Sequence, residues 1–184
     1  MNTSTPLAAH RPDTLAPDTL CSLLRMAVGD LVLAVSIDDV REILQVARLT
    51  PLPRTPEFVR GVMNLRGAVV PVIDLSVRLG HQPTALGRRS CIVVVECPGT
   101  MTEDGHTPTP SAMGLLVDAV FEVFDRRVAE IEPAPTLGTT VEPAFLRGIT
   151  RADGALIGVL ALTQVLGEAQ LRQAIAEHAP ALTH

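Results

Sequence analysis

Short apolar runs, separated by turn residues, dominate the chain. Apolar residues recur on both sides of Gly29–Asp30 between residues 20 and 35, which predicts a strand, a turn and a second strand. Residues 91–96 (CIVVVE) form a β-branched run and are expected to make a central strand. The strand pattern resumes at residues 114–120 and continues through residues 122–129. Alternating short strands with Gly and Pro turns indicate a mainly β protein.

The clearest local pattern is residues 58–75, FVRGVMNLRGAVVPVIDL. Two apolar runs flank a turn at residues 64–67, which predicts a β-hairpin. Gly67 can adopt a positive φ, as such a turn requires. Asp74 follows the second strand and is expected to cap a short helix that begins near Leu75 and ends at Gly80.

Other segments predict helices and one further strand. Ser36 is expected to cap a short helix over residues 37–44. Its apolar residues share one face and are Ile37, Val40, Ile43 and Leu44, with Arg41 and Glu42 off that face. Residues 46–52 predict a strand, and residues 55–57 predict a helical turn. Thr163 is expected to cap a C-terminal helix that extends to about residue 178.

The hairpin sequence occurs twice, because residues 145–162 read FLRGITRADGALIGVLAL. Without gaps the identical pairs are Phe58/Phe145, Arg60/Arg147, Gly61/Gly148, Gly67/Gly154, Ala68/Ala155, Val72/Val159 and Leu75/Leu162. Upstream, DxVxEIL at 38–44 matches DxVxEVF at 118–124, and PxP at 51–53 matches PxP at 133–135. Any two hairpins with an Arg-Gly pair could look alike, but three matching blocks in one order favour duplication. We therefore expect two similar β units related by an approximate two-fold axis.

The amino-acid composition excludes several classes of partner and of chemistry. The 184 residues suffice for one domain or two small fused ones, and 47% are hydrophobic, enough for a sizeable core. Aromatic residues are only 2%, too few for a surface that grips proline-rich peptides or single-stranded nucleic acid. A net charge of −5 without long basic runs also argues against nucleic acid as a partner. All 15 basic residues are Arg, which excludes lysine chemistry.

The remaining sequence features concern the cellular compartment and the flexible segments of the chain. Cys21, Cys91 and Cys97 lack metal-ligand spacing and are expected to be free thiols in a reducing cytoplasm. The sequence shows no export signal and no apolar run of the ~20 residues that a membrane span needs. Residues 1–18 are expected to form a flexible tail, and 98–112 a mobile loop.

No catalytic motif stands out, and the five His are not spaced to share a metal. No cofactor or metal is therefore expected. Asp74 and Asp118 are candidate catalytic carboxylates, although capping and turn roles explain both more simply. A small-molecule-binding β-barrel or a minor hydrolase that uses one of them remains the alternative function, and a deep pocket with convergent polar groups would favour it.

Arg66 and Glu42 allow two interpretations. An Arg at a tight turn and a Glu beside apolar residues suit a protein interface, where a guanidinium pairs with carboxylates. They could equally form a surface ion pair, worth ~0–1 kcal/mol. The sequence alone favours neither interpretation over the other.

Three blocks, VREI at 40–43, PLP at 51–53 and the whole 58–75 stretch with its NLRGxxxPxxDL motif, resemble the CheW family of chemotaxis coupling proteins. GLLVDAV at 114–120 and FLRG at 145–148 resemble that family's second half. The resemblance covers roughly residues 20–167. It implies a domain over 19–167 made of two SH3-like five-stranded β-barrels packed side by side, with short helices and a C-terminal helix or tail at 168–184.

The resemblance also implies a non-enzymatic, cytoplasmic adaptor. Such proteins link the tips of methyl-accepting chemoreceptors to the regulatory domain of the histidine kinase CheA, with receptor helices in the groove between the barrels and the kinase on a separate face. The residues that it places at or near the partner-binding region are Glu42, Ile43, Arg66, Ile37, Val40, Arg60 and Asn64. Gly61 and Gly67 are expected to be structural turn residues.

Two features depart from the family pattern. The 98–112 loop is longer than the usual hairpin there, and the first strand lacks aromatic residues. They leave open which array the chain serves, flagellar or another chemosensory pathway. The length leaves no room for the added receiver domain of the CheV type.

Overall fold

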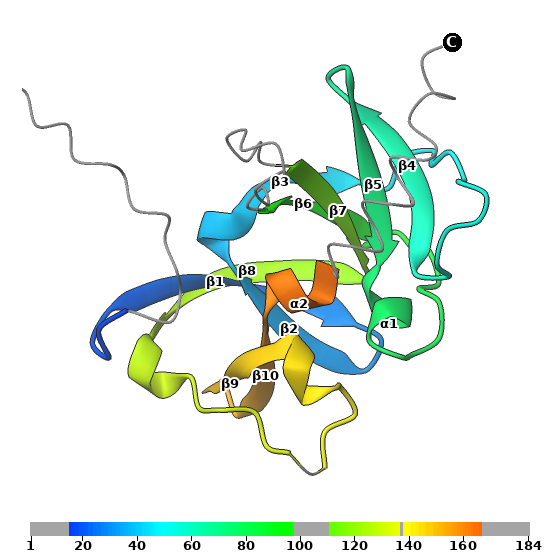
Figure 1. Cartoon of the computed structure of the whole chain (residues 1–184). Coiled ribbons are helices and arrows are strands. Elements are labelled where there is room, and N and C mark those ends of the chain that lie inside the picture. The colour runs from blue at the N-terminus through cyan, green and yellow to red at the C-terminus, as the bar shows by residue number, and fades with distance from the viewer. Residues whose placement is uncertain (1–14, 98–110, 137, 167–184) are drawn as a thin grey trace, which may run out of the picture.

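The computed structural model describes residues 15–97, 111–136 and 138–166, and these form two packed five-stranded β-sheets (Figure 1). The first sheet has the order β8-β1-β2-β10-β9 and the second has the order β3-β6-β7-β5-β4. The strands of the first sheet are β1 (Leu20–Val28), β2 (Leu31–Ser36), β8 (Ala119–Arg127), β9 (Leu146–Ala152) and β10 (Ala155–Leu160). Those of the second are β3 (Val40–Gln45), β4 (Val59–Leu65), β5 (Ala68–Asp74), β6 (Cys91–Cys97) and β7 (Ser111–Val117). The short helices are η2 (Ile37–Asp39), α1 (Leu75–Arg78), η3 (Val128–Glu130), η4 (Pro143–Phe145) and α2 (Leu162–Leu166).

The two sheets are built alike, as the sequence repeat predicted. The first copy contains β3, β4, β5 and α1, and its counterparts are β8, β9, β10 and α2. With these counterparts, the two sheets have the same strand order if β1 corresponds to β6 and β2 corresponds to β7. The second sheet is therefore one continuous stretch of chain inserted into the first, whose strands come from both ends of the described chain.

Each sheet has its two edges linked by one β-bridge. In the second sheet, Thr50 lies beyond β3 and pairs with Val62 on β4, through N–H···O distances of 2.8 and 2.9 Å. In the first sheet, Glu132 pairs in the same way with Ile149 on β9. The chain that leaves one edge strand thus returns to the opposite edge, and each sheet curls on itself.

In both copies, the glycine of the repeated Arg-Gly pair directly precedes the strand residue of the bridge. A Cβ on Gly148 would lie 2.5 Å from the Glu132 carbonyl oxygen, and one on Gly61 would lie 2.4 Å from that of Thr50. Only glycine lets the crossing backbone approach so closely. Gly61 therefore lies inside β4 at a bulge, with φ 143°, and the expectation that it is a turn residue was wrong.

The described residues form three buried apolar clusters. A shared core between the sheets takes Leu24 and Met26 from the first sheet and Val93, Val95 and Leu115 from the second. The alternate residues of the same strands, such as Leu23 on β1 and Ile92 on β6, face a separate core within each sheet. Successive side chains of a strand point to opposite faces, so these strands are covered on both sides.

Arg78 joins the two copies of the repeat at the edge of the shared core. Its guanidinium carbon lies 4.8 Å from the ring centroid of Phe58 and 4.7 Å from that of Phe145, which occupy equivalent positions in the repeat. Arg78 Nε also donates to the Val165 carbonyl of α2, and Nη2 donates to that of Gln164 at 3.2 Å. Burial lowers the pKa of this guanidinium, while Glu142 opposes the shift.

Local patterns predicted the β1–β2, β4–β5 and β6 strands and α1 correctly. The predicted helix over 37–44 was wrong: only η2 is helical, Ser36 makes no side-chain cap bond, and residues 40–45 form β3. Pairing with β6 outweighs a weak helical pattern rich in β-branched residues. Residues 46–52 contribute a single bridge rather than a strand, and 55–57 form no helix. Thr163 lies within α2, not before it.

Residues 1–14 of the tail expected over 1–18, most of the 98–112 loop and the C-terminal helix beyond residue 166 lie outside the described residues. Within the described part of the chain, no helix has the length and apolar character needed to cross a membrane.

We predict that Gly148→Ala destabilises the protein by about 2 kcal/mol, the usual scale for forcing extra atoms into a packed site. The new methyl group would collide with the backbone of the bridging segment, which cannot move aside as a side-chain tip can. Urea unfolding measures the effect. Gly87→Ala is the control, because its nearest heavy atom would be the Ser90 Oγ at 3.9 Å. Equal stability of the two variants would contradict the close approach.

We also predict that Arg78→Met lowers the free energy of unfolding by about 2 kcal/mol, from lost cation–π contacts and charge-assisted hydrogen bonds. Methionine keeps much of the apolar stem, so the loss reports the guanidinium. Arg88→Met, on an exposed loop residue, is the control. If both variants unfold at the same urea concentration as the unmodified chain, Arg78 does not join the two copies.

Candidate functional site

Glu42 and Arg66 form a bidentate ion pair at one end of the second sheet. Arg66 Nη1 and Nη2 lie 2.9 and 3.0 Å from the two carboxylate oxygens of Glu42. Glu42 comes from β3 and Arg66 from the β4–β5 turn, so the pair connects opposite edges of the curled sheet. The Glu42 side chain is 18% exposed and that of Arg66 is 73% exposed. The pair thus presents a fixed guanidinium to solvent.

The turn that carries Arg66 is tightly defined. Leu65 pairs with Ala68, leaving Arg66 and Gly67 as a two-residue turn with φ values of 53° and 87°. Two positive φ values are typical of the type I′ turn that suits the twist of a hairpin. Asn64 Oδ1 accepts a hydrogen bond from the Gly67 N–H at 2.9 Å and closes the turn. Asn64 therefore positions Arg66.

Ile37, Val40 and Ile43 were expected to share one face of a helix, but Ile37 lies in η2 while Val40 and Ile43 lie in β3. Ile37 and Val40 are half-buried against the shared core, whereas Ile43 is 45% exposed. The grouping assumed helical spacing, but the bulge in β3 keeps Val40 and Ile43 on one face, opposite Val95 and Val93 of β6, and of the two only Val40 packs against the shared core. Val69, which was not predicted, is the other exposed aliphatic residue of this end, three positions after Arg66.

Arg60 points to an interior site instead. Its Nη1 lies 3.5 Å from Oδ2 of Asp74, a carboxylate that is fully buried. Asp74 also accepts from the backbone N–H of Ser76, Val77 and Thr84 and from the Thr84 hydroxyl. The carboxylate caps α1 and anchors the following loop, so its hydrogen-bonding capacity serves the fold.

Asp118 also has a structural bond, since its Oδ2 accepts from the Gly29 N–H at 2.7 Å. Both candidate carboxylates therefore have structural hydrogen bonds with backbone N–H groups. Among the described residues, no group of three or more His, Cys, Asp or Glu side chains is placed to hold a metal ion. Burial raises the pKa of the free thiols of Cys21 and Cys91, which keeps them protonated.

The corresponding end of the first sheet carries a related charge cluster that sequence reasoning missed. Arg25 Nη1 lies 2.9 Å from Oε1 of Glu122 and 3.4 Å from Oδ2 of Asp153. Under the repeat, Glu122 corresponds to Glu42 and Asp153 to Arg66, and Asp153 has the same positive φ, 51°. The repeat alignment would have identified both acids, but Arg25 lies outside it.

The exposed aliphatic residues also recur in pairs. Val123 corresponds to Ile43, and Leu156 corresponds to Val69, and all four are exposed. Phe121, also exposed, lies with its ring centroid 5.8 Å from the Arg25 guanidinium carbon. Each sheet therefore ends in an ion cluster flanked by exposed aliphatic side chains. We name these the second-sheet end (Glu42, Ile43, Arg66, Val69) and the first-sheet end (Arg25, Glu122, Val123, Asp153, Leu156).

Comparison with known proteins identifies relatives over most of the chain. The sequence profile of the CheW-like domain matches residues 22–170. The chemotaxis protein CheW of Rhizobium meliloti (strain 1021) is 35% identical over 143 residues, 78% of this chain and 85% of that protein. Protein FrzA of Myxococcus xanthus is 36% identical over 147 residues, 79% of this chain and 84% of that protein. The crystal structure of the scaffolding protein TtCheW from Thermoanaerobacter tengcongensis aligns with a TM-score of 0.68 and 32% identity, over 84% of this chain and 91% of that one.

We predict that Arg25→Met raises the pKa of Glu122. In the folded protein a backbone hydrogen bond, and then Arg25, lower the pKa of this carboxyl group. A carboxyl group with a depressed folded-state pKa stabilises the fold above its unfolded pKa, and this contribution is lost as pH falls through the folded value. Loss of Arg25 should therefore remove part of the depression, and the backbone bond should keep the rest.

Carbon-detected NMR titration of the Glu122 side chain measures this shift, with Arg41→Met as a control at an exposed position on β3. A Glu122 pKa that is the same in the Arg25→Met variant and the unmodified chain would show that the cluster does not form in solution.

Proposed function

The chain belongs to the family of CheW-like domains, and from this premise we propose that it couples the tips of methyl-accepting chemoreceptors to the regulatory domain of a CheA-type histidine kinase. The family is one of chemotaxis scaffolds rather than enzymes, so the chain is an adaptor, and the resemblance, fold class and adaptor function predicted from the sequence are confirmed. The named partners, their contact residues and a cytoplasmic place within receptor arrays belong to the proposal.

The observation that carries the proposal is the second-sheet end. Glu42 binds two of the N–H groups of Arg66, and the remaining ones face solvent. A guanidinium has five donors in a rigid plane, so a partner carboxylate can bind while the pair stays intact. The side chain is already held in one geometry, which reduces the entropy lost when a partner binds.

The surrounding residues have graded roles in this proposal. Ile43 and Val69 supply exposed apolar area beside Arg66, and Asn64 holds the turn. Ile37 and Val40 support β3 from the shared core and contact a partner only at their exposed parts. Arg60 acts indirectly, through the buried Asp74 that anchors α1. We assign the receptor tip to the second-sheet end, as the resemblance implies.

We assign the kinase regulatory domain to the first-sheet end. This end repeats the exposed aliphatic pair but replaces the cationic turn residue with Asp153. An adaptor must distinguish two partners, and surfaces of like shape but opposite turn charge provide that distinction. The adaptor can then hold both partners at once, because the two ends belong to different sheets.

The proposal predicts that Arg66→Glu weakens binding of a receptor cytoplasmic fragment by at least about ten-fold, the scale of losing one interfacial charge contact. Thermal stability should change little, since an exposed ion pair contributes ~0–1 kcal/mol. Arg151→Glu is the matched control: Arg151 is exposed and is the repeat counterpart of Asn64, so the charge change is the same beside the other hairpin turn. Binding to receptor and kinase fragments is measured separately by calorimetry.

The double variant Glu42→Arg/Arg66→Glu separates the two interpretations of the ion pair. It restores an ion pair of reversed direction. If the pair only supports the fold, the double variant should bind receptor normally; if Arg66 contacts the receptor, binding should stay weak. Receptor binding unchanged in Arg66→Glu, or lost equally in Arg151→Glu, would contradict the assigned surface.

A further inference from the structure

The edge strands β3 and β8 carry β-bulges at the same place in the repeat. In β3 the register shifts around Arg41, which is the extra residue. In β8 it shifts over Phe121 and Glu122, which together lie opposite Arg25 of β1. The two DxVxE blocks of the repeat make Phe121 the counterpart of Arg41. A bulge re-aims the side chain that it carries, so this position is exposed in both copies.

Folding does not explain the exposed side chain of Phe121. The residue is 43% exposed and belongs to none of the three buried apolar clusters. The other phenylalanines are half-buried, each against an arginine side chain, and are Phe58, Phe124 and Phe145. All four lie in the described part of the chain, and the sequence has no Tyr or Trp. Phe121 is therefore the one exposed aromatic residue of the protein.

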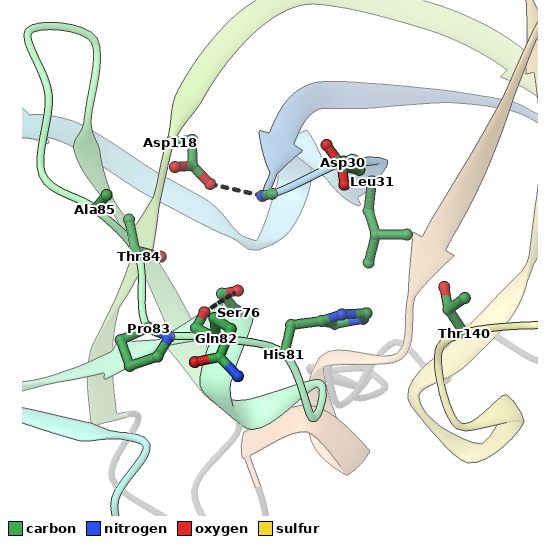
Figure 2. Close-up of a pocket in the computed structure, with 11 residues that line it drawn as sticks. Asp30, Leu31, Ser76, His81, Gln82, Pro83, Thr84, Ala85, Asp118 and Thr140 are labelled. Atoms are coloured by element: carbon green, nitrogen blue, oxygen red, sulfur yellow. Dashed lines mark hydrogen bonds between the residues drawn. The ribbon is translucent and has the colours of Figure 1, made fainter.

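Contacts on both sides hold the bulge of β8 in one shape. Just before the strand, Asp118 Oδ2 accepts a hydrogen bond from the Gly29 N–H at 2.7 Å, as Figure 2 shows. At the bulge, the Arg25 guanidinium carbon lies 5.8 Å from the centroid of the Phe121 ring, while Arg25 Nη1 pairs with Glu122 at 2.9 Å. A side chain that is already positioned loses less entropy when a partner covers it.

Arg41 gives the second sheet a side chain of different chemistry at the same bulge. The side chain is 52% exposed, and its Nη1 lies 3.9 Å from Oε1 of Glu96, which is equally exposed. An ion pair so long and so exposed contributes little, and the guanidinium can turn to a partner instead. The bulge therefore presents an aromatic ring at the first-sheet end and, at the second-sheet end, a cation in addition to Arg66.

We propose that the bulge residue determines which partner each sheet end binds: Phe121 anchors the kinase regulatory domain, and Arg41 favours the receptor tip. This inference rests on the proposed adaptor function and on its assignment of the partners to the two ends. Phe121 and the neighbouring Val123 fit an apolar pocket on the partner, where a buried aromatic ring contributes most. A guanidinium in that pocket would lose its hydration without a hydrogen-bond partner, so Arg41 excludes the same surface from the second-sheet end.

The kinase side is tested with Phe121→Arg in the full-length protein, titrated separately with the kinase regulatory domain and a receptor cytoplasmic fragment by calorimetry. Kinase binding should weaken about thirty-fold, the scale of losing an interface hot spot. Receptor binding should match that of the unmodified chain. Phe121→Ser removes the ring without adding a charge and should likewise weaken only kinase binding.

Leu86→Ser is the matched control for a lost apolar side chain. Leu86 is 58% exposed and lies on the loop between α1 and β6, outside both sheet ends. This variant should bind both partners like the unmodified chain. The melting temperature of each variant is measured in parallel, and Phe121→Ser decides the outcome if Phe121→Arg fails to fold.

The receptor side is tested with the reverse exchange, Arg41→Phe. Receptor binding should weaken by at least about ten-fold, the scale of one interfacial charge contact, and kinase binding should not change. The two exchanges therefore have opposite expected effects on the two partners. A variant that loses both partners equally while remaining folded, or an Arg41→Phe variant that binds receptor normally, would overturn the inference.

The same titrations separate this inference from the adaptor function. If the unmodified chain binds neither fragment, the adaptor function is refuted, and this inference with it. If the unmodified chain binds the kinase domain and both Phe121 variants bind it equally well, this inference alone is refuted. Loss of kinase binding in Leu86→Ser to the same extent as in Phe121→Ser would also refute it, because any exposed apolar residue would then serve.

Discussion

The fold depends on covering both faces of its central strands. Leu23 and Leu24 on β1, and Val93 and Val94 on β6, are adjacent residues that are all almost fully buried. Adjacent side chains in a strand face opposite sides, so one face fills the interior of its own sheet and the other must be covered by something else. The shared core provides that cover, and it takes residues from both sheets. Neither sheet could stand alone without exposing a large apolar face to water, which is a strong cost at ~25 cal/mol per Å².

The two copies of the repeat differ at the place where they meet. The first copy keeps Asp74 as the N-cap of α1, while Ala161 occupies the equivalent position before α2. Instead, α2 receives Arg78 from the first copy at its last carbonyl groups, where a cation also complements the helix dipole. The same guanidinium lies between the two equivalent phenylalanines. Arg78 thus contacts one aromatic ring from each copy and the last carbonyl groups of α2. These contacts fix how the two copies meet.

The parts of the fold that could be predicted were those set by neighbouring residues. The β4–β5 hairpin follows from turn chemistry and alternation, and the repeat gave the second hairpin. The insertion of one sheet into the other could not be predicted, because it depends on pairings such as β2 with β10 between residues far apart in the sequence. The partners Glu42 and Arg66 were both noted, but their contact arises from the curl of the sheet. The bulge between Val40 and Glu42 shifts the alternation of side chains between the two faces of β3. The apolar residues therefore do not alternate in the sequence, and their spacing predicted a helix.

The two sheet ends show how one backbone can present opposite charges. Arg66 and Asp153 occupy the same turn position with φ values of 53° and 51°, so the exchange of charge needed no change in the turn. At the second-sheet end the turn residue pairs directly with Glu42; at the first-sheet end the turn residue is itself acidic, and Arg25 from β1 compensates both acids. The exposed guanidinium of Arg66 and the exposed carboxylate of Asp153 therefore face solvent from otherwise similar surroundings. A partner whose charge attracts it to one sheet end is repelled by the turn residue of the other end. The duplicated fold can therefore distinguish two partners with two surfaces of the same shape.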